Sequence, residues 1–213
     1  MQAFVNVIKS RRSIRKFKPD PVSIALIKKI LDAARWAPSA HNSQPWRFVV
    51  VTDKILKEKL AKAMAEAWRE DMIKNGIPQD EISKLLKESI KAFTETPVLI
   101  VVCLTMEDMH RYPDERRRRA EYIMAVQSVA ASIQNILLMA HALGLGSCWK
   151  CAPLFCPDTV RRILEIPQDI DPQAILLVGY PLETPKPPPR RPLEDIVYYE
   201  KWGSKEGKSE GSY

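Results

Sequence analysis

Three arginines surround a serine near the N-terminus, in the stretch RRSIRKF. Guanidinium groups offer a rigid fork of donors that matches phosphate oxygens, and a serine hydroxyl adds one more short donor. In an extended segment Ser13 and Arg15 project to the same side while Arg12 points away, so Arg11, Ser13 and Arg15 can converge on one anion. Basic groups are also favourable at any helix C-terminus, so this stretch alone leaves an anion site and a solvated helix end equally open.

The stretch APSAHNSQPWRF, residues 37–48, gathers small polar side chains between two prolines. Its backbone amides belong to no predicted strand, so they and the polar side chains can read the hydrogen-bonding edge of a planar heterocycle. The same residue types are ordinary turn formers between a helix and a strand. Taken alone, the composition of this stretch favours the turn.

Metal ligands and nucleophiles are poorly represented in the sequence. The histidines at 41, 110 and 141 show no metal-ligand spacing, and the C-x2-C-x4-C pattern of Cys148, Cys151 and Cys156 lacks a fourth ligand. No acid, base or nucleophile constellation stands out. The sequence therefore predicts no metal site and no catalytic side chain, and it leaves the role of the cysteines open.

Hydrophobic periodicity predicts the elements that position these residues. Ser23 and Asp53 are each suited to cap a helix. Helices are expected near residues 4–8, from 24 to Pro38, and over about 53–69, 80–94, 116–141 and 158–164; strands are expected over 46–52, 97–105, 146–150 and 174–181.

Two elements should dominate the core. The run PVLIVVCLT, residues 97–105, is continuously apolar, which is typical of a central strand covered on both faces. The segment 116–141 is the longest expected helix, and its wide apolar stripe should cross the core or a subunit interface. Gly144 and Gly146 are expected to end it.

Composition and charge narrow the class of protein. With 213 residues, 46% hydrophobic and 28% charged, the chain suits one soluble domain, with no segment near the roughly 20 apolar residues of a membrane span and no secretory signal. We expect it in the cytoplasm. The net charge of +7 suits a nucleic acid or a phosphorylated small molecule. Arg116 to Arg119 are expected on a solvated face, paired with Glu115 and Glu121.

The C-terminal segment differs from the rest of the chain. Six prolines lie between 181 and 192, which favours an extended conformation without internal hydrogen bonds. Apolar residues follow, too many for a solvated linker, so the tail of about 181–203 should wrap over another surface such as a second subunit. Residues 204–213 are expected to be disordered.

Several motifs in a fixed order give the chain a family resemblance. RRSIRKF followed by APSAHNSQPWRFVVV, and later ALGLGSCW, LLVGYP and PPPRRPLEDIV, resemble the flavin-dependent nitroreductase family over nearly the whole chain, except about 70–95. The resemblance implies an α+β fold, a sheet flanked by helices, in a single domain of residues 1–203. It also implies an intertwined homodimer with one FMN at each of two interface sites.

The resemblance also implies roles for individual residues. FMN-binding positions would be Arg11, Arg12, Ser13 and Arg15 for the phosphate and ribityl chain, Pro38, Ser39, Ala40, Asn42 and Gln44 bordering the ring from the other subunit, Gly146 and Ser147 through their backbone, and Arg190 returning from the tail. Similar tails often carry a lysine two positions before that arginine, where Pro188 stands here. Substrate contacts would be His41 and Trp68.

In such an enzyme the flavin carries the chemistry. NADH or NADPH would reduce FMN and leave, and a nitroaromatic, quinone or enone acceptor would then take the electrons in the same cavity. The polar stretch would stabilise the negative charge that develops on the pyrimidine side of the ring. The sequence chooses neither between NADH and NADPH nor among acceptors, and no G-x-G-x-x-G fingerprint occurs.

Two alternatives stay open at this level. The segment from AEAWREDMIKNG to TPVLIVVC is similar to the flavin domain of enzymes of deazaflavin coenzyme biosynthesis, which would make the substrate a phosphorylated deazaflavin precursor. A non-enzymatic, basic polyanion-binding protein is the alternative of another class. The sequence offers no nucleic-acid module and no aromatic stripe among the basic groups, so nucleic acid is not expected as a partner.

Overall fold

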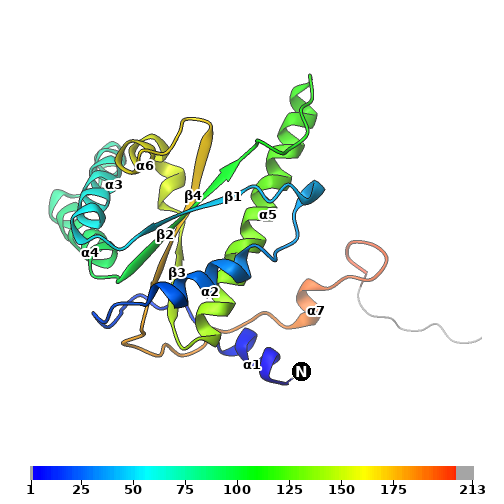
Figure 1. Ribbon diagram of the computed structural model, residues 1–213, viewed down its shortest axis with the longest axis horizontal. Coiled ribbons are helices and arrows are strands. Elements are labelled where there is room, and N and C mark those ends of the chain that lie inside the picture. The colour runs from blue at the N-terminus through cyan, green and yellow to red at the C-terminus, as the bar shows by residue number, and fades with distance from the viewer. Residues whose placement is uncertain (1, 205–213) are drawn as a thin grey trace, which may run out of the picture.

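The predicted α+β fold is confirmed by a computed structural model of the chain, which describes residues 2–204. Its sheet is antiparallel throughout and has the strand order β1-β2-β4-β3 (Figure 1). The strands are β1 (Trp46–Val51), β2 (Val98–Thr105), β3 (Gly146–Lys150) and β4 (Ile170–Gly179).

Helices cover both faces of the sheet (Figure 1). One layer holds α2 (Ile24–Ala34) and α5 (Glu115–Ala142), and the other holds α3 (Lys54–Lys74), α4 (Gln79–Thr94) and α6 (Pro157–Leu164). The remaining elements are shorter: α1 (Gln2–Ser10), η1 (Ala40–Asn42), η2 (Ala152–Phe155) and α7 (Leu193–Ile196).

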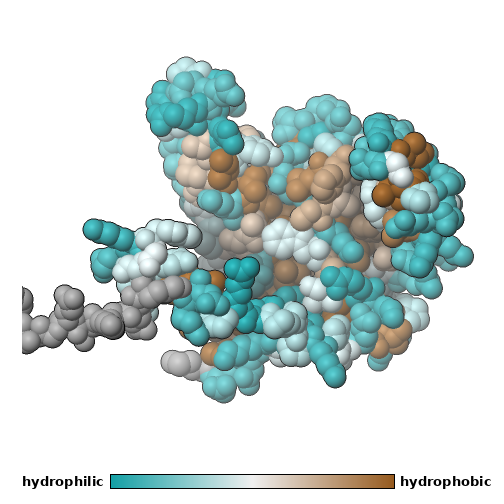
Figure 2. All heavy atoms as spheres, turned by 180° about the vertical axis from the view of Figure 1, so that it is seen from behind, coloured by the Kyte–Doolittle hydropathy of each residue, from teal (hydrophilic) through white to brown (hydrophobic). Residues whose placement is uncertain are grey.

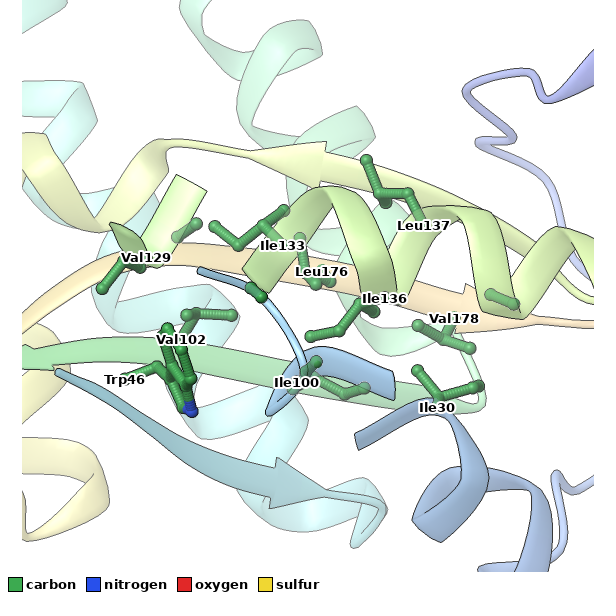
Figure 3. Close-up of a cluster of buried hydrophobic side chains, with 14 of the residues drawn as sticks. Ile30, Trp46, Ile100, Val102, Val129, Ile133, Ile136, Leu137, Leu176 and Val178 are labelled. Atoms are coloured by element: carbon green, nitrogen blue, oxygen red, sulfur yellow. The ribbon is translucent and has the colours of Figure 1, made fainter. Parts of the chain in front are cut away.

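Strand β2 is the centre of the molecule, as predicted. Every residue of it is buried, and its side chains alternate between two separate hydrophobic clusters, one on each side of the sheet. In Figure 3, Ile100 and Val102 face Ile133 and Ile136 of α5. A strand buried on both faces loses its alternating pattern, which explains the continuous apolar run in the sequence.

Helix α5 is the longest element, as predicted. Of the two glycines expected to end it, only Gly144 does so. Gly144 has a φ of +77°, and Leu145 N–H donates to Ala140 O at 2.8 Å, which closes the last turn. Gly146 was expected to help end the helix, but it is the first residue of β3. There a Cβ atom would lie 2.8 Å from Ile14 Cγ1, so close packing requires this glycine.

Helix α5 is long and apolar enough to cross a membrane, judged by length and composition. The sequence analysis had expected no segment of this kind. Its buried residues, among them Val129, Ile133 and Ile136, pack into the cluster between the sheet and α2 (Figure 3). The apolar stripe is therefore used by the core of this fold.

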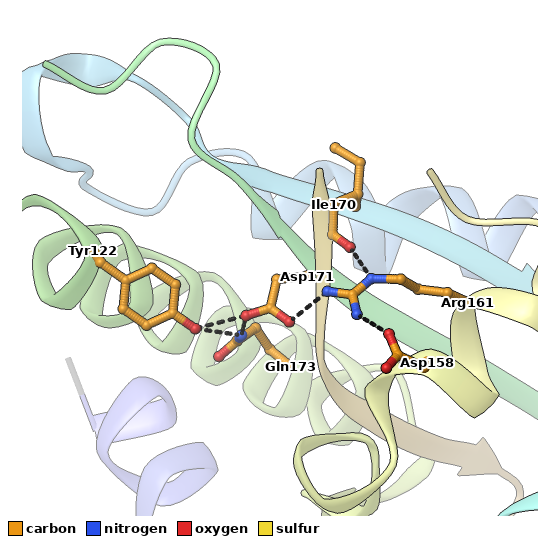
Figure 4. A network of polar contacts seen from close by, with 6 residues as sticks. All are labelled: Tyr122, Asp158, Arg161, Ile170, Asp171 and Gln173. Atoms are coloured by element: carbon orange, nitrogen blue, oxygen red, sulfur yellow. Dashed lines mark hydrogen bonds and ion pairs between the residues drawn. The ribbon is translucent and has the colours of Figure 1, made fainter. Parts of the chain in front are cut away.

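Strand β4 begins at Ile170, four residues before the predicted start, because polar residues conceal the strand in the sequence. Asp171 accepts hydrogen bonds from Tyr122 Oη at 2.6 Å and from Arg161 Nη2 at 3.2 Å, which joins α5, α6 and β4 (Figure 4). Gln173 Nε2 donates to the same carboxylate at 2.7 Å. The first residues of β4 thus pair their polar side chains with the flanking helices.

Other element boundaries differ modestly from the predictions. The side chains of Ser23 and Asp53 cap α2 and α3 as expected. Helix α2 ends at Ala34, before Pro38, and α3 continues to Lys74 rather than about residue 69. The predicted strand 46–52 and the predicted helices 80–94 and 158–164 are confirmed within one or two residues.

The C-terminal tail leaves the body of the molecule (Figures 1 and 2). Residues 183–192 form no helix or strand, as expected, and α7 follows. Leu193 and Trp202 are 71% and 89% exposed, which is unusual for large apolar side chains. Wrapping around a second subunit stays a prediction, and the disorder predicted for 204–213 falls on residues outside the described range except Ser204.

Candidate functional site

The predicted phosphate segment meets Gly146 and Ser147, two of the residues predicted to contact the ring. After α1 the chain runs beside β3, where Ser13 forms a parallel bridge with Ser147 and Ile14 N–H donates to Ser147 O at 2.9 Å. The close approach of Ile14 to Gly146 fixes this contact. Ser13, Gly146 and Ser147, far apart in the sequence, thus belong to one site.

Positive charges crowd this site. We call Arg11, Arg12, Ser13, His141 and Arg190 the basic cluster. The pKa of Arg11 is lowered by burial and then by the charges of Arg12 and Arg190, so the tail arginine lies within electrostatic reach of Arg11. The pKa of His141 is lowered by burial and then by Arg11 and Arg12. Because like charges repel, an anion bound here would stabilise the arrangement.

A buried hydroxyl group in the same place lacks a partner. Ser147 is 1% exposed, and its Oγ has no hydrogen-bond partner among residues 2–204. Such a group is costly unless something satisfies it. It borders a cavity of about 160 Å³ that Arg12 and His141 also line. The crowded cations and the unpaired hydroxyl together fit an anionic, hydrogen-bonding ligand such as FMN.

The other two arginines of the N-terminal motif are oriented differently. Arg12 Nη1 donates to Lys9 O at 2.7 Å and to Arg11 O at 2.8 Å, so its guanidinium group folds back on the end of α1. Arg15 is exposed, and its Nη1 lies 3.4 Å from Ser13 O. Of the three arginines in the motif, Arg11 is therefore the one whose charge interacts with that of Arg190.

The second predicted cluster, residues 38–44, connects α2 to β1 and contains η1. We call it the polar loop. Its backbone is unusual, because His41, Asn42 and Gln44 have positive φ angles of 56°, 53° and 45°. A left-handed conformation costs a non-glycine residue about 1 to 3 kcal/mol, and such residues concentrate at functional sites.

Hydrogen bonds hold the polar loop in this conformation. Gln44 N–H donates to Ser39 Oγ at 3.1 Å, and Ala40 N–H donates to Ser128 Oγ of α5 at 3.2 Å. Ser43 Oγ donates to Met109 Sδ at 3.1 Å. The loop is thus a rigid element docked on the N-terminal half of α5.

The polar loop and the basic cluster do not meet within one chain. Ser128 contacts the loop and His141 belongs to the cluster, and these two residues are thirteen positions apart on α5. At about 1.5 Å per helical residue this is about 20 Å along the axis. The two clusters therefore lie at different places along one helix, the basic cluster at its C-terminal end and the polar loop against its N-terminal half.

Glu121 corrects an expectation about the start of α5. It was expected on the solvated face with Arg116 to Arg119, but it is buried. Its Oε1 lies 3.4 Å from His41 Nε2, and its Oε2 accepts a hydrogen bond from His110 N–H at 3.2 Å. Arg116 to Arg119 are exposed, as expected, and Arg117 pairs with Asp114.

Trp68, predicted as a substrate contact, lies away from His41 on α3. It lines an apolar cavity of about 280 Å³ with Met64, Phe155 and Cys156. None of its described contacts joins it to the polar loop or the basic cluster, so its role stays a prediction.

Several site residues were missed from the sequence. His141 was not predicted at the site, yet its Nε2 lies 2.7 Å from Ser10 Oγ, and the charges of Arg11 and Arg12 lower its pKa. His110 and Glu121 join His41, and Ser128 anchors the polar loop. Glu121 and Ser128 are buried on the same side of α5 as Ala125 and Ser132, so a polar residue at a position that helical spacing places on the buried face is the signal that could have indicated them.

Comparison with known sequences gives a consistent result. Residues 8–180 match the profile of the family described as the nitroreductase family. A Methanothermobacter thermautotrophicus protein, whose name pairs NADH dehydrogenase with NAD(P)H nitroreductase, is 33% identical over 202 residues, covering 93% of this chain and 87% of that protein. The NADH dehydrogenase of Thermus thermophilus is 33% identical over 215 residues, covering 89% and 92%.

Solved structures share the fold. A BluB-like flavoprotein from Clostridium difficile superposes with a TM-score of 0.77 at 27% identity, covering 92% of this chain and 98% of that chain. A Desulfovibrio desulfuricans protein solved in complex with FMN gives a TM-score of 0.70 at 26% identity, covering 93% and 97%.

Proposed function

The chain belongs to the nitroreductase family, and from that premise we propose that it is a homodimeric FMN-dependent oxidoreductase of the cytoplasm. It would transfer electrons from NADH or NADPH to a conjugated electrophile such as a nitroaromatic, a quinone or an enone. The observation that carries this proposal is the basic cluster beside the unpaired Ser147 hydroxyl, because it fits an anionic ligand with further hydrogen-bonding groups.

In the proposed dimer, the basic cluster of one chain and the polar loop of the other would be two half-sites of one FMN site. Each half-site would hold a different part of the cofactor. In the basic cluster Arg11 and Arg190 would neutralise the phosphate, and Ser13 would donate a hydrogen bond to it. The backbone of Gly146 and Ser147 would border the ring, and Arg12 and Arg15 would lie along the ribityl chain. The polar loop of the partner would complete the site through Pro38, Ser39, Ala40, Asn42 and Gln44.

Bound FMN would supply the redox chemistry, accepting a hydride from the nicotinamide and giving electrons to the acceptor in a second, ping-pong half-reaction. The polar loop would direct amide and side-chain donors at the pyrimidine edge, where negative charge develops. Because left-handed residues and the bonds to Ser39 and Ser128 already fix the loop, little reorganisation is needed. His41 would border the acceptor.

A dimer would bring a basic cluster and a polar loop together, although the two lie far apart within one chain. The two half-sites lie about 20 Å apart along α5, so a loop from a second chain is needed beside each basic cluster. The exposed apolar side chains of the tail, Leu193, Ile196 and Trp202, support an interface that this tail completes.

The test is the visible absorption spectrum of the purified protein, with release and identification of the chromophore. We expect the bands of oxidised flavin and about one FMN per chain. Reduction by NADH and by NADPH, followed by reoxidation with a quinone or a nitroaromatic, then identifies donor and acceptor. A colourless protein that takes up no added FMN would contradict the proposal.

A further inference from the structure

Three potential metal ligands meet beside the polar loop, and each comes from a different segment. His41 belongs to η1, His110 to the connection after β2, and Glu121 to α5. One ligand atom from each lies within 4.8 Å of the others. The two imidazole rings are stacked with centroids 3.8 Å apart. No single stretch of sequence contains this set, so spacing rules do not find it.

Glu121 is a buried carboxyl group whose two oxygens face His41 and His110. Its side chain is 4% exposed, and within residues 2–204 no lysine or arginine nitrogen lies within 4.0 Å of its carboxylate. A buried charge without compensation is strongly unfavourable. The groups around it are two histidines, which are the side chains best suited to share a metal ion with a carboxylate.

The ligand types and distances suit a first-row divalent metal ion. We propose that His41, His110 and Glu121 bind one such ion, with zinc as the first to test. Two ligands of a tetrahedral zinc ion at about 2.1 Å are separated by about 3.4 Å, and His41 Nε2 and Glu121 Oε1 are 3.4 Å apart. Stacked rings cannot both direct lone pairs at one ion, so the exposed His110 ring must turn on binding.

The site leaves one coordination position for a further ligand. His110 and Glu121 also line a cavity of about 710 Å³, together with Tyr112, Arg118 and Asp169. Three protein ligands with an open fourth position are typical of zinc sites that bind water or a small molecule. Imidazole donors also disfavour magnesium and calcium, which prefer oxygen ligands.

The backbone of His41 supports this assignment. It has a left-handed φ of 56°, and its imidazole contacts Glu121 of α5 through Nε2. A metal ion would hold the loop to α5 and to the segment that follows β2. It would therefore fix the conformation of the loop independently of any cofactor.

The experiment is equilibrium dialysis of the intact, FMN-containing protein against zinc after chelator treatment, with metal analysis. We expect one tightly bound zinc ion per chain. His110→Asn, on an exposed side chain, should weaken binding by at least the 10- to 100-fold that loss of a supporting residue costs. Glu121→Gln should do the same, and an unchanged circular dichroism spectrum shows that each variant is folded.

Two control variants separate this site from other zinc ligands in the chain. His141→Asn and Cys151→Ser remove a histidine outside the site and an exposed thiol, and both should keep full zinc affinity. Cobalt(II) substituted for zinc should show no thiolate charge-transfer band. Less than one zinc per chain, binding unaffected by His110→Asn, or binding lost in Cys151→Ser would overturn the assignment. FMN content is read separately, so failure here leaves the proposed function untouched.

Discussion

The basic cluster lies at the C-terminal end of α5, the polar loop packs against the N-terminal half of α5, and the two regions are built in opposite ways. At the basic cluster the backbone is ordinary, with the bridge between Ser13 and Ser147, and the unusual feature is the crowding of positive charge. At the polar loop the side chains are small and the unusual feature is the backbone, with three left-handed residues. One region is therefore suited to recognise charge, and the other to present hydrogen-bonding groups in a fixed geometry.

The largest expected effect comes from the basic cluster. The double substitution Arg11→Ala and Ser13→Ala would remove the two charge-assisted hydrogen bonds that we propose to the phosphate, each of about 1.5 to 3 kcal/mol. FMN affinity should fall by at least about a hundredfold, measured by fluorescence titration. Arg116→Ala removes an exposed arginine from the other end of α5 and should leave affinity unchanged. Undiminished FMN binding in the double variant would refute the phosphate assignment.

The second effect concerns the assembly that brings the two regions together. A chain ending before Pro185 loses Arg190 and the exposed apolar side chains of the tail, so its dimer should dissociate at least about tenfold more readily. Analytical ultracentrifugation over a range of concentrations measures this. Removing only residues 205–213 is the matched control and should leave the dimer intact. An unaltered dimer after the longer truncation means that the tail does not wrap the partner.

A smaller effect distinguishes the role of the polar loop in FMN binding from its contribution to the stability of the fold. Ser39→Ala removes the acceptor for Gln44 N–H, worth about 1 kcal/mol, so the melting temperature should fall by about 2 to 4 °C. Ser23→Ala removes the cap of α2 at a similar cost. Both variants should lose stability, but only Ser39→Ala should also weaken FMN binding. Equal FMN affinities in the two variants would show that the loop conformation is irrelevant to the cofactor.

The smallest effect is a pH dependence at His141. Its pKa is lowered in the folded chain by burial and by Arg11 and Arg12, so its contribution to stability is complete above the unfolded pKa of about 6.5 and is lost as pH falls toward the lower folded value. Urea midpoints measured from pH 7.5 to 5 should therefore fall less steeply in His141→Gln than in the wild type. The same slope in both proteins would show that His141 makes no such contribution.

Binding of an anion should raise the pKa of His141, which the neighbouring arginines lower in the free protein. A phosphate or FMN phosphate near Arg11 and Arg12 offsets their positive charge, so the pKa of His141 should rise on binding. Nuclear magnetic resonance can follow it directly, because the chain has only three histidines. A pKa unchanged by FMN would place the phosphate elsewhere.

The sequence indicated the chemistry of the basic cluster more clearly than the backbone conformation of the polar loop. Arginine and serine indicate anion binding by residue type, so the sequence predicted Arg11 and Ser13 for a phosphate site, and the family resemblance added Arg190. The continuous apolar run of β2 predicted its central place in the sheet. The left-handed angles of His41, Asn42 and Gln44 carry no such mark, because asparagine and glutamine also occur in ordinary turns.

Tertiary contacts concealed the remaining features. The early start of β4 was missed because Asp171 and Gln173 satisfy their polar groups against α5 and α6 rather than in solvent. The burial of Glu121 was missed for a related reason, since its partners His41 and His110 come from distant segments. Helical spacing near Arg116 to Arg119 suggested local ion pairs, which are weaker than these long-range contacts.

The most direct test of the account mixes two inactive chains. One carries Arg11→Ala with Ser13→Ala; the other carries Asn42→Gly with Gln44→Gly, which removes the loop side chains while glycine permits the same φ angles. If each site joins the basic cluster of one chain to the polar loop of the other, the mixed dimer contains one intact site. We predict that unfolding and refolding the mixture restores about one FMN per mixed dimer at wild-type affinity. A mixture that binds no more FMN than its parents would contradict a site shared between two chains.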